Sequence, residues 1–144
     1  RRQRQMCIRD SYNINEQLYF VDLPGYGYAT ANESVKAQWG KLIEDYLHQS
    51  RKIKAVFLLI DIRHAPSEND CIMYDWIVSR GYKPVLIATK LDKIKRSQVA
   101  KQTKLIRETL RADSDTILIP YSSLTKQGRE EIYELLDGML TEEA

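Results

Sequence analysis

Four short apolar runs alternate along the chain with segments of helical period. The runs are almost continuous in Val, Ile, Leu and Phe, which is typical of strands buried on both faces of a sheet. We predict strands at Leu18–Asp22, Ala55–Asp61, Val85–Thr89 and Thr116–Tyr121. The stretch Tyr12–Asn15 is interpreted as the end of an earlier strand that turns in a hairpin onto the first of these.

Between the strands, apolar residues recur at the spacing of one helical face. The first predicted helix carries Val35, Trp39, Leu42, Ile43, Tyr46 and Leu47. The second begins after Pro66-Ser67, where Ser67 and Asp70 form a capping box, and ends at Gly81. Its expected inward side chains are Met73, Tyr74, Ile77 and Val78.

Two further helices follow in the C-terminal half. Ser97 is the predicted cap of the third, which turns Val99, Ile106 and Leu110 inward. Gly128 precedes the last, whose apolar residues are Ile132, Leu135, Leu136 and Met139. Alternating strands and helices predict an α/β fold, a mostly parallel sheet with helices on both faces. Such sheets bind ligands at the carboxyl ends of their strands.

Composition restricts the possible partners. The 144 residues suit one domain, and 22 basic against 20 acidic residues give no overall field that would favour DNA or a membrane surface. Cys7 and Cys71 lie far apart and only two histidines occur, so a metal site built on Cys or His is not expected, and a reduced cytoplasmic setting fits. No apolar run approaches the roughly 20 residues of a membrane span.

The run Thr89-Lys90-Leu91-Asp92 stands at the C-terminal end of the third predicted strand. A carboxylate at this place can accept hydrogen bonds from both N1–H and the N2 amine of guanine, while the lysine stem lies along the ring. Adenine has no N2 amine and presents a lone pair at N1. Because an unpaired buried polar group costs a few kcal/mol, such a site can reject the wrong base by about 10⁴-fold.

Two more motifs stand at strand ends in the expected order. Asp22-Leu23-Pro24-Gly25 follows the first strand, and in GTP-binding folds such an aspartate holds the Mg²⁺ shell while the glycine N–H contacts the terminal phosphate. A strand followed by a Pro-Gly turn is the alternative. Tyr121-Ser122-Ser123 follows the fourth strand, where a backbone N–H can reach guanine O6.

From about Tyr12 to Leu140 the chain resembles the EngB (YihA/YsxC) family of bacterial GTPases, of the translation-factor-related TRAFAC class. The residues that carry the resemblance are Phe20–Ala29, Asp61–Pro66, Ala88–Lys93 and Tyr121–Ser123, with Trp39, Tyr46, Leu47 and Arg51. The resemblance implies a Ras-like P-loop GTPase domain that binds GTP or GDP with Mg²⁺. It also implies a role in assembly of the large ribosomal subunit, through its rRNA or proteins, and in cell-division septation.

Carried over by position, Asp22 would hold Mg²⁺ and Gly25 would contact the γ-phosphate, within a nucleotide site that includes Leu23 and Pro24. Lys90 and Asp92 would recognise the base, flanked by Thr89 and Leu91. Tyr121, Ser122 and Ser123 would form the loop below it. Two departures stand out: Leu124 replaces the lysine of the usual Ser-Ala-Lys, and Tyr26 replaces a water-orienting glutamine, so slow GTP hydrolysis is expected of a complete protein.

No G-x-x-x-x-G-K-[S/T] motif occurs in the sequence, although this loop normally supplies the phosphate cradle and a magnesium ligand. We therefore expect residues 12–144 to be the C-terminal part of an EngB-type G domain that lacks the P-loop strand. Residues 1–11 are basic and without clear period, and we interpret them as a non-native or disordered segment.

Two other functions remain open at this point. A degenerate domain that binds only a protein or the ribosome would need no phosphate loop, and a CheY-like receiver would also carry strand-end aspartates and a lysine. A receiver, however, has no need of the Lys90-x-Asp92 and Ser122-Ser123 pair of motifs. Arg63 and His64 could face a ligand or the ribosome, and Asp61 before them could cap the loop after its strand. We favour structural roles for all three.

Overall fold

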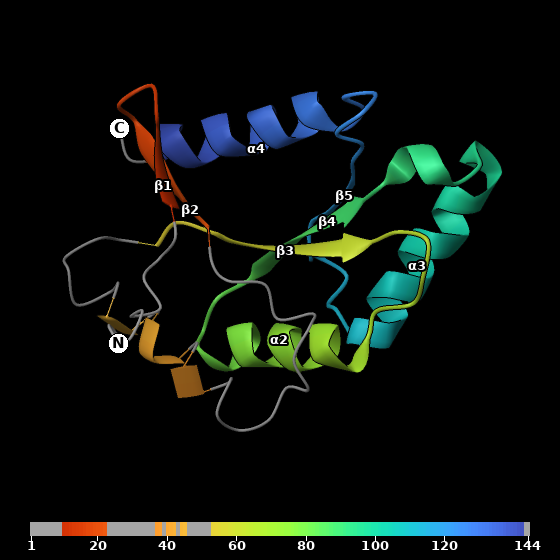
Figure 1. Cartoon of the computed structure of the whole chain (residues 1–144), viewed down its shortest axis with the longest axis horizontal. Helices are drawn as coiled ribbons and strands as arrows, with labels where there is room; N and C mark the ends of the chain where they lie inside the picture. Colours follow the sequence, from red (N-terminus) through yellow and green to blue (C-terminus); the bar gives the residue numbers. More distant parts are fainter. Residues whose placement is uncertain (1–9, 23–36, 39, 43, 46–52, 143–144) are drawn as a thin grey trace, which may run out of the picture. The chain divides into compact units, whose positions relative to one another are not determined.

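The computed structural model describes residues 10–22, 37–38, 40–42, 44–45 and 53–142, and Figure 1 shows them as coloured ribbon. The chain forms two compact units, residues 1–52 and residues 53–144. The predicted motifs are divided between them, with Asp22 in the first unit and both Asp92 and Ser122 in the second.

In the first unit, β1 (Asp10–Ile14) pairs antiparallel with β2 (Leu18–Asp22). The connecting turn has Asn15 and Glu16 at φ 52° and 60°, and Asn13 Oδ1 accepts the Glu16 N–H at 2.9 Å. The predicted hairpin is confirmed, and β1 begins at Asp10, two residues inside the segment left out of the fold prediction. The described residues between 37 and 45 are helical, whereas Val35, Trp39, Ile43, Tyr46 and Leu47 of the first predicted helix lie outside the described part.

The second unit is a three-stranded parallel sheet in the order β3-β4-β5, with helices on both faces (Figure 1). The predicted fold class, an α/β fold built on a parallel sheet, is therefore correct. The elements are β3 (Val56–Asp61), α2 (Glu68–Ser79), β4 (Pro84–Thr89), the 3₁₀ turns Leu91–Lys93 and Arg96–Gln98, α3 (Val99–Leu110), β5 (Leu118–Pro120) and α4 (Arg129–Thr141).

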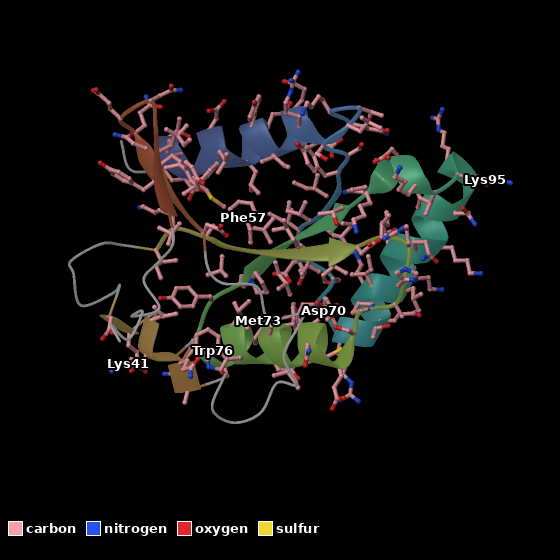
Figure 2. All side chains as sticks on the ribbon, in the orientation of Figure 1. Lys41, Phe57, Asp70, Met73, Trp76 and Lys95 are labelled. Carbon is pink, nitrogen blue, oxygen red and sulfur yellow. The ribbon has the colours of Figure 1, made fainter. Side chains whose placement is uncertain are left out.

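Alternate residues of the strands build two apolar layers. On the face covered by α4, Val85, Ile87 and Ile119 form a cluster against which Phe57 and three α4 side chains pack. Those α4 side chains are Ile132, Leu135 and Met139. On the other face, α2 and α3 contact the sheet and contribute the buried residues Met73, Tyr74, Ile77, Ile106 and Leu110. Figure 2 shows Met73 rising from α2 toward the sheet and Phe57 on the opposite side of it.

Helix α2 begins as predicted. Ser67 Oγ accepts the Asp70 N–H at 3.1 Å and Asp70 Oδ2 accepts the Ser67 N–H at 2.8 Å, so the capping box is complete. Gly81 follows the helix with φ 86°. The prediction that Val78 points inward is wrong, because its side chain is 47% exposed.

Helix α3 begins differently from the prediction. Ser97 is not its cap, because a 3₁₀ turn over Arg96–Gln98 comes first and places Ser97 inside that turn. The turn is closed by Gln98, whose Oε1 accepts the Lys95 N–H at 3.0 Å. Ile106 and Leu110 are buried as expected, at 0% and 2% exposure.

Strand β5 is shorter than predicted and ends at Pro120. Just outside β5, Leu86 N–H donates to Ile117 O and Tyr121 N–H donates to Ala88 O. The backbone N–H and C=O groups of odd-numbered residues along this segment therefore point toward β4. Pro120, which has no N–H, therefore stands where its nitrogen faces away from the ladder. Among the described residues, no helix is long and apolar enough to cross a membrane.

Candidate functional site

The carboxyl ends of the three parallel strands lie side by side. The register pairs Asp61 with Thr89 and Ala88 with Pro120, so the loops that follow these strands emerge at one edge of the sheet. This edge brings together two of the predicted motifs, Thr89–Asp92 and Tyr121–Ser123. It also brings in Asp61, for which the sequence favoured a purely structural role.

Backbone hydrogen bonds join the loops after β4 and β5. Tyr121 N–H donates to Ala88 O at 2.8 Å, and Leu91 N–H donates back to Tyr121 O at 3.1 Å. Thr89 Oγ1 donates to Ile60 O at 3.2 Å, and Leu91 is buried. These bonds fix the shape of the edge. They already engage the Thr89 hydroxyl, the Leu91 N–H and both backbone groups of Tyr121.

Asp92 and Ser122 form the polar centre of the edge. Ser122 Oγ donates to Asp92 Oδ1 at 2.7 Å, and Ser122 is fully buried. This hydrogen bond lowers the pKa of the Asp92 carboxyl below its ordinary value. The Asp92 side chain remains 14% exposed, and the Lys93 ammonium lies 3.6 Å from its Oδ2. Asp92 is therefore an ionised, oriented acceptor.

The loop after Ser122 is closed by its own backbone. Ser122 N–H donates to Gln127 O at 3.1 Å, Lys126 N–H donates to Ser122 O at 2.9 Å, and Thr125 N–H donates to Ser122 Oγ at 3.1 Å. Ser122 N–H is therefore used internally. Within the described residues no hydrogen bond engages the N–H of Ser123 or Leu124, and these two are the donors that remain for a ligand carbonyl.

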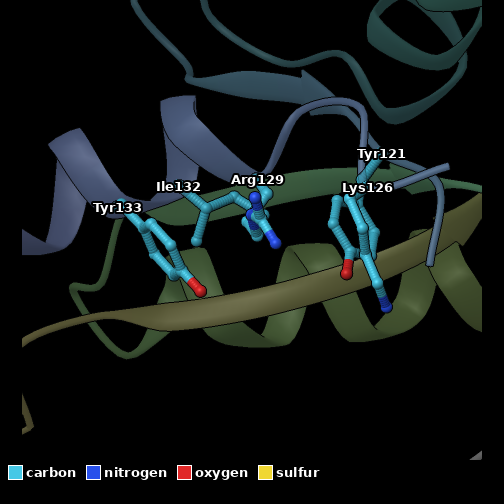
Figure 3. A pocket seen from close by; sticks show the side chains of 5 residues that line it. All are labelled: Tyr121, Lys126, Arg129, Ile132 and Tyr133. Atoms are coloured by element: carbon cyan, nitrogen blue, oxygen red, sulfur yellow. The ribbon is translucent and has the colours of Figure 1, made fainter.

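Two residues beside this loop differ in their surroundings. Leu124 is 74% exposed, so an apolar side chain stands open to solvent next to Ser123. Tyr121 instead packs against the Val85, Ile87 and Ile119 cluster. Figure 3 shows Tyr121 lining a cavity together with Lys126 and three α4 residues, Arg129, Ile132 and Tyr133. The Tyr121 side chain thus belongs to the sheet face under α4.

Lys90 links the Thr89–Asp92 motif to the end of β3. Its backbone is left-handed, with φ 61° and ψ 36°, and its ammonium lies 2.9 Å from Asp61 Oδ2. Arg63 also pairs with Asp61, and its guanidinium holds the pKa of the Asp61 carboxyl well below its usual range, with Lys90 adding to the effect. The Arg63 N–H donates to Asp61 Oδ1 at 3.0 Å, so the predicted capping of the loop is confirmed.

The remaining predicted residues belong to the first unit. Asp22 ends β2 and is exposed, whereas Leu23, Pro24 and Gly25 lie outside the described residues. A single carboxylate is a suitable oxygen donor for Mg²⁺ but is not a metal site alone. The described residues contain no group of three or more His, Cys, Asp or Glu side chains that could hold a metal ion.

A solved structure shares this fold. The chain superposes with a TM-score of 0.66 on a crystal structure of a probable GTP-binding protein EngB, covering 86% of this chain and 78% of that one at 18% identity. The chain therefore shares the fold of that structure, an α/β fold with a parallel sheet flanked by helices.

Sequence relatives identify the family. A probable GTP-binding protein EngB of Lachnospira eligens is 62% identical over 127 residues, covering 88% of this chain and 60% of the relative. The protein of the same name from Lachnoclostridium phytofermentans is 55% identical and covers 90% of this chain and 64% of the relative. The one from Clostridium perfringens is 48% identical and covers 90% of this chain and 66% of the relative. No family model matches. The chain belongs to the EngB family, and it spans about 60–66% of the length of these relatives.

Proposed function

We propose that this chain supplies the base-recognition part of a site for GTP and GDP. The observation that carries the proposal is the Asp92–Ser122 hydrogen bond of 2.7 Å at the edge where the two motifs meet. A carboxylate has lone pairs for several donors, so Asp92 can keep this bond and still accept guanine N1–H and N2–H. The N–H of Ser123 or Leu124 would donate to O6, and the exposed Leu124 side chain would pack on the ring.

Asp22 would hold the shell of a Mg²⁺ ion, which neutralises phosphate charge when bound, and Leu23, Pro24 and Gly25 would lie along the phosphates. No phosphate-cradle motif occurs in the 144 residues, and most of the phosphate contacts would come from outside them. In a complete protein of this family, slow GTP hydrolysis would accompany a cytoplasmic role in assembly of the large ribosomal subunit and in septation. The family resemblance alone implies this hydrolysis and this cellular role.

The proposal is tested by comparing nucleotides on two proteins. One is the chain itself. The other, called the extended chain below, joins residues 12–144 to the part of the Lachnospira eligens relative that lies outside the matched region. Fluorescent GDP is titrated into each and then displaced with GDP, ADP or inosine diphosphate, which lacks the N2 amine. We expect the extended chain to prefer GDP over ADP by about 10³-fold or more, because ADP leaves the carboxylate unpaired.

Displacement by inosine diphosphate should fall between the two, since only one hydrogen bond to Asp92 is lost. The chain alone should show the same order with much weaker binding. Equal displacement by GDP and ADP from the extended chain would contradict base recognition. A chain that binds no nucleotide in either form would instead support the alternative function, a module that contacts only a protein or the ribosome.

A further inference from the structure

Three side chains from neighbouring loops form a compact ionic group at the edge of the sheet, and the motifs do not account for two of them. Asp61 Oδ2 lies 2.9 Å from Lys90 Nζ and 2.7 Å from an Arg63 terminal nitrogen. Arg63 Nε lies 3.0 Å and 3.2 Å from the two carboxylate oxygens of Asp61. One carboxylate therefore joins a cation from its own loop to the lysine of the Thr-Lys-x-Asp motif.

The register of the sheet makes this contact possible. Asp61 and Thr89 are paired in the β3–β4 ladder, and Ile62 N–H continues the ladder by donating to Thr89 O at 3.0 Å. Lys90 then turns into the left-handed conformation. For a residue with a Cβ this conformation costs about 1–2 kcal/mol, which glycine would avoid.

Arg63 determines how Asp61 presents its carboxylate. Its backbone N–H and its side chain both bind Asp61, which closes a two-residue turn and fixes the plane of the carboxylate. Oδ2 is then oriented toward Lys90. Two cations and one anion leave a net positive charge beside Asp92, and the Arg63 guanidinium is also attracted by that carboxylate.

On the proposed guanine site, this geometry gives Lys90 a defined place. Its side chain is 52% exposed, and an exposed lysine normally samples many rotamers. An ammonium held at one end restricts the stem, and the stem is the part that would lie along the base. We propose that Asp61 is a positioning residue for nucleotide recognition, which holds the Lys90 side chain beside the base while Arg63 orients it. The inference rests on the proposed function, because it concerns the same site.

An ordinary surface ion pair is the competing explanation, and such pairs contribute only about 0–1 kcal/mol. The chain contains a matched example. Lys83 Nζ lies 2.9 Å from Asp115 Oδ2, the same distance as in the Lys90–Asp61 pair, but away from the strand ends that form the site. Asp115→Asn therefore breaks a lysine–aspartate pair of equal length without touching the proposed site.

The test is a double-mutant cycle in the extended chain, with the dissociation constant of GDP as the measurement. Asp61→Asn should weaken GDP binding by about tenfold, the size expected for a hydrogen bond between charged groups, and Asp115→Asn should not change it. In a Lys90→Met background, Asp61→Asn should change the affinity less than about twofold, because its effect passes through the lysine. Equal losses in both backgrounds would mean a structural role and would overturn the proposal.

A second measurement does not depend on nucleotide. In the 144-residue chain labelled with ¹³C-lysine, the two Hε protons of Lys90 should be inequivalent while the ammonium is held, and should become equivalent in Asp61→Asn. If they are equivalent in the unmodified chain, Asp61 does not restrain Lys90 and the proposal fails. If they respond as expected but the extended chain does not distinguish GDP from ADP, the proposed function fails while the positioning contact stands. If the Asp61→Asn protein binds GDP as tightly as the parent and still prefers GDP over ADP, the positioning role alone is contradicted.

Discussion

Gly128 lies so close to Pro120 that a Cβ on residue 128 would overlap the Pro120 carbonyl oxygen. Its φ is 88°, which also disfavours a side chain. This contact sets the start of α4 against the end of β5 and closes the loop that contains Ser122. Gly128→Ala should therefore destabilise the extended chain by about 2–5 kcal/mol, from backbone strain and overlap together.

Two other glycines separate these causes. Gly81 has φ 86° and nothing within 4 Å of an added Cβ, so Gly81→Ala should cost only the strain, about 1–2 kcal/mol. Gly138 lies inside α4 with nothing near an added Cβ, and Gly138→Ala should stabilise by about 0.5–1 kcal/mol. Urea unfolding of the three variants gives the order. A Gly128→Ala protein as stable as Gly81→Ala would show that the backbone at Pro120 shifts at little cost in free energy.

Ser122 supports Asp92 from a fully buried position. Ser122→Ala removes the donor to Asp92 Oδ1 and the acceptor of the Thr125 N–H. Leaving these groups without partners should lower stability by about 1–3 kcal/mol and weaken GDP binding to the extended chain about tenfold. Fluorescent GDP titration and urea unfolding measure the two effects. Ser114→Ala is the matched control, because Ser114 is exposed in the turn before β5, away from the strand ends that form the proposed site, and it should change neither quantity.

Asp92→Asn should shift nucleotide preference from GDP toward xanthosine diphosphate in the extended chain. Xanthine has a C2 carbonyl where guanine has its amine, so the asparagine NH₂ can donate to it while the amide oxygen accepts N1–H. Each mismatched contact costs about 1–3 kcal/mol, which reverses the preference by one or more orders of magnitude. Displacement of fluorescent GDP from the protein by each of the two nucleotides measures the shift. If the variant keeps the parent preference, Asp92 does not recognise the base.

The Asp61 carboxylate should make stability depend on pH in the acid range. Arg63 and Lys90 lower the pKa of Asp61 in the folded chain. In the unfolded chain an aspartate has a pKa of about 3.9. The ionised form therefore stabilises the fold above that pH, and the contribution is lost as the pH falls toward the lower folded value. The difference in free energy of unfolding between the parent and Asp61→Asn should be constant near neutral pH and shrink below about pH 4. A difference that grows on acidification would contradict the assignment.

The sequence predicted the parts of this fold that follow from local pattern. Continuous apolar runs located β2, β3 and β4 to within one residue at each end, and Ser67 with Asp70 marked the start of α2. Ser97 was misassigned because a serine before an apolar helix is a capping signal whether or not a 3₁₀ turn intervenes. Val78 was placed inward by its spacing alone. That prediction failed because the width of the buried face of a helix depends on the neighbouring elements, which spacing does not reveal.

The contacts across loops could not be predicted in the same way. Asp61 and Lys90 are separated by 29 positions in the sequence, and their pairing depends on the β3–β4 register. Ser122 was predicted to lie at the site, but the bond from its hydroxyl to Asp92 depends on the backbone closure of residues 122–127. A weak signal did exist: an acidic residue ends β3 just as one ends β2, and an arginine follows it two positions later.

The hydrogen bond from Leu91 N–H to Tyr121 O has a consequence for the affinity that the proposed guanine site would have for a base. It ties the Asp92 loop to the end of β5, and Ser122 ties it again through its side chain. Loops fixed in this way give up their freedom when the protein folds, not when a ligand arrives. The entropy cost of assembling the recognition edge is then already met before association, and it is not subtracted from the binding free energy.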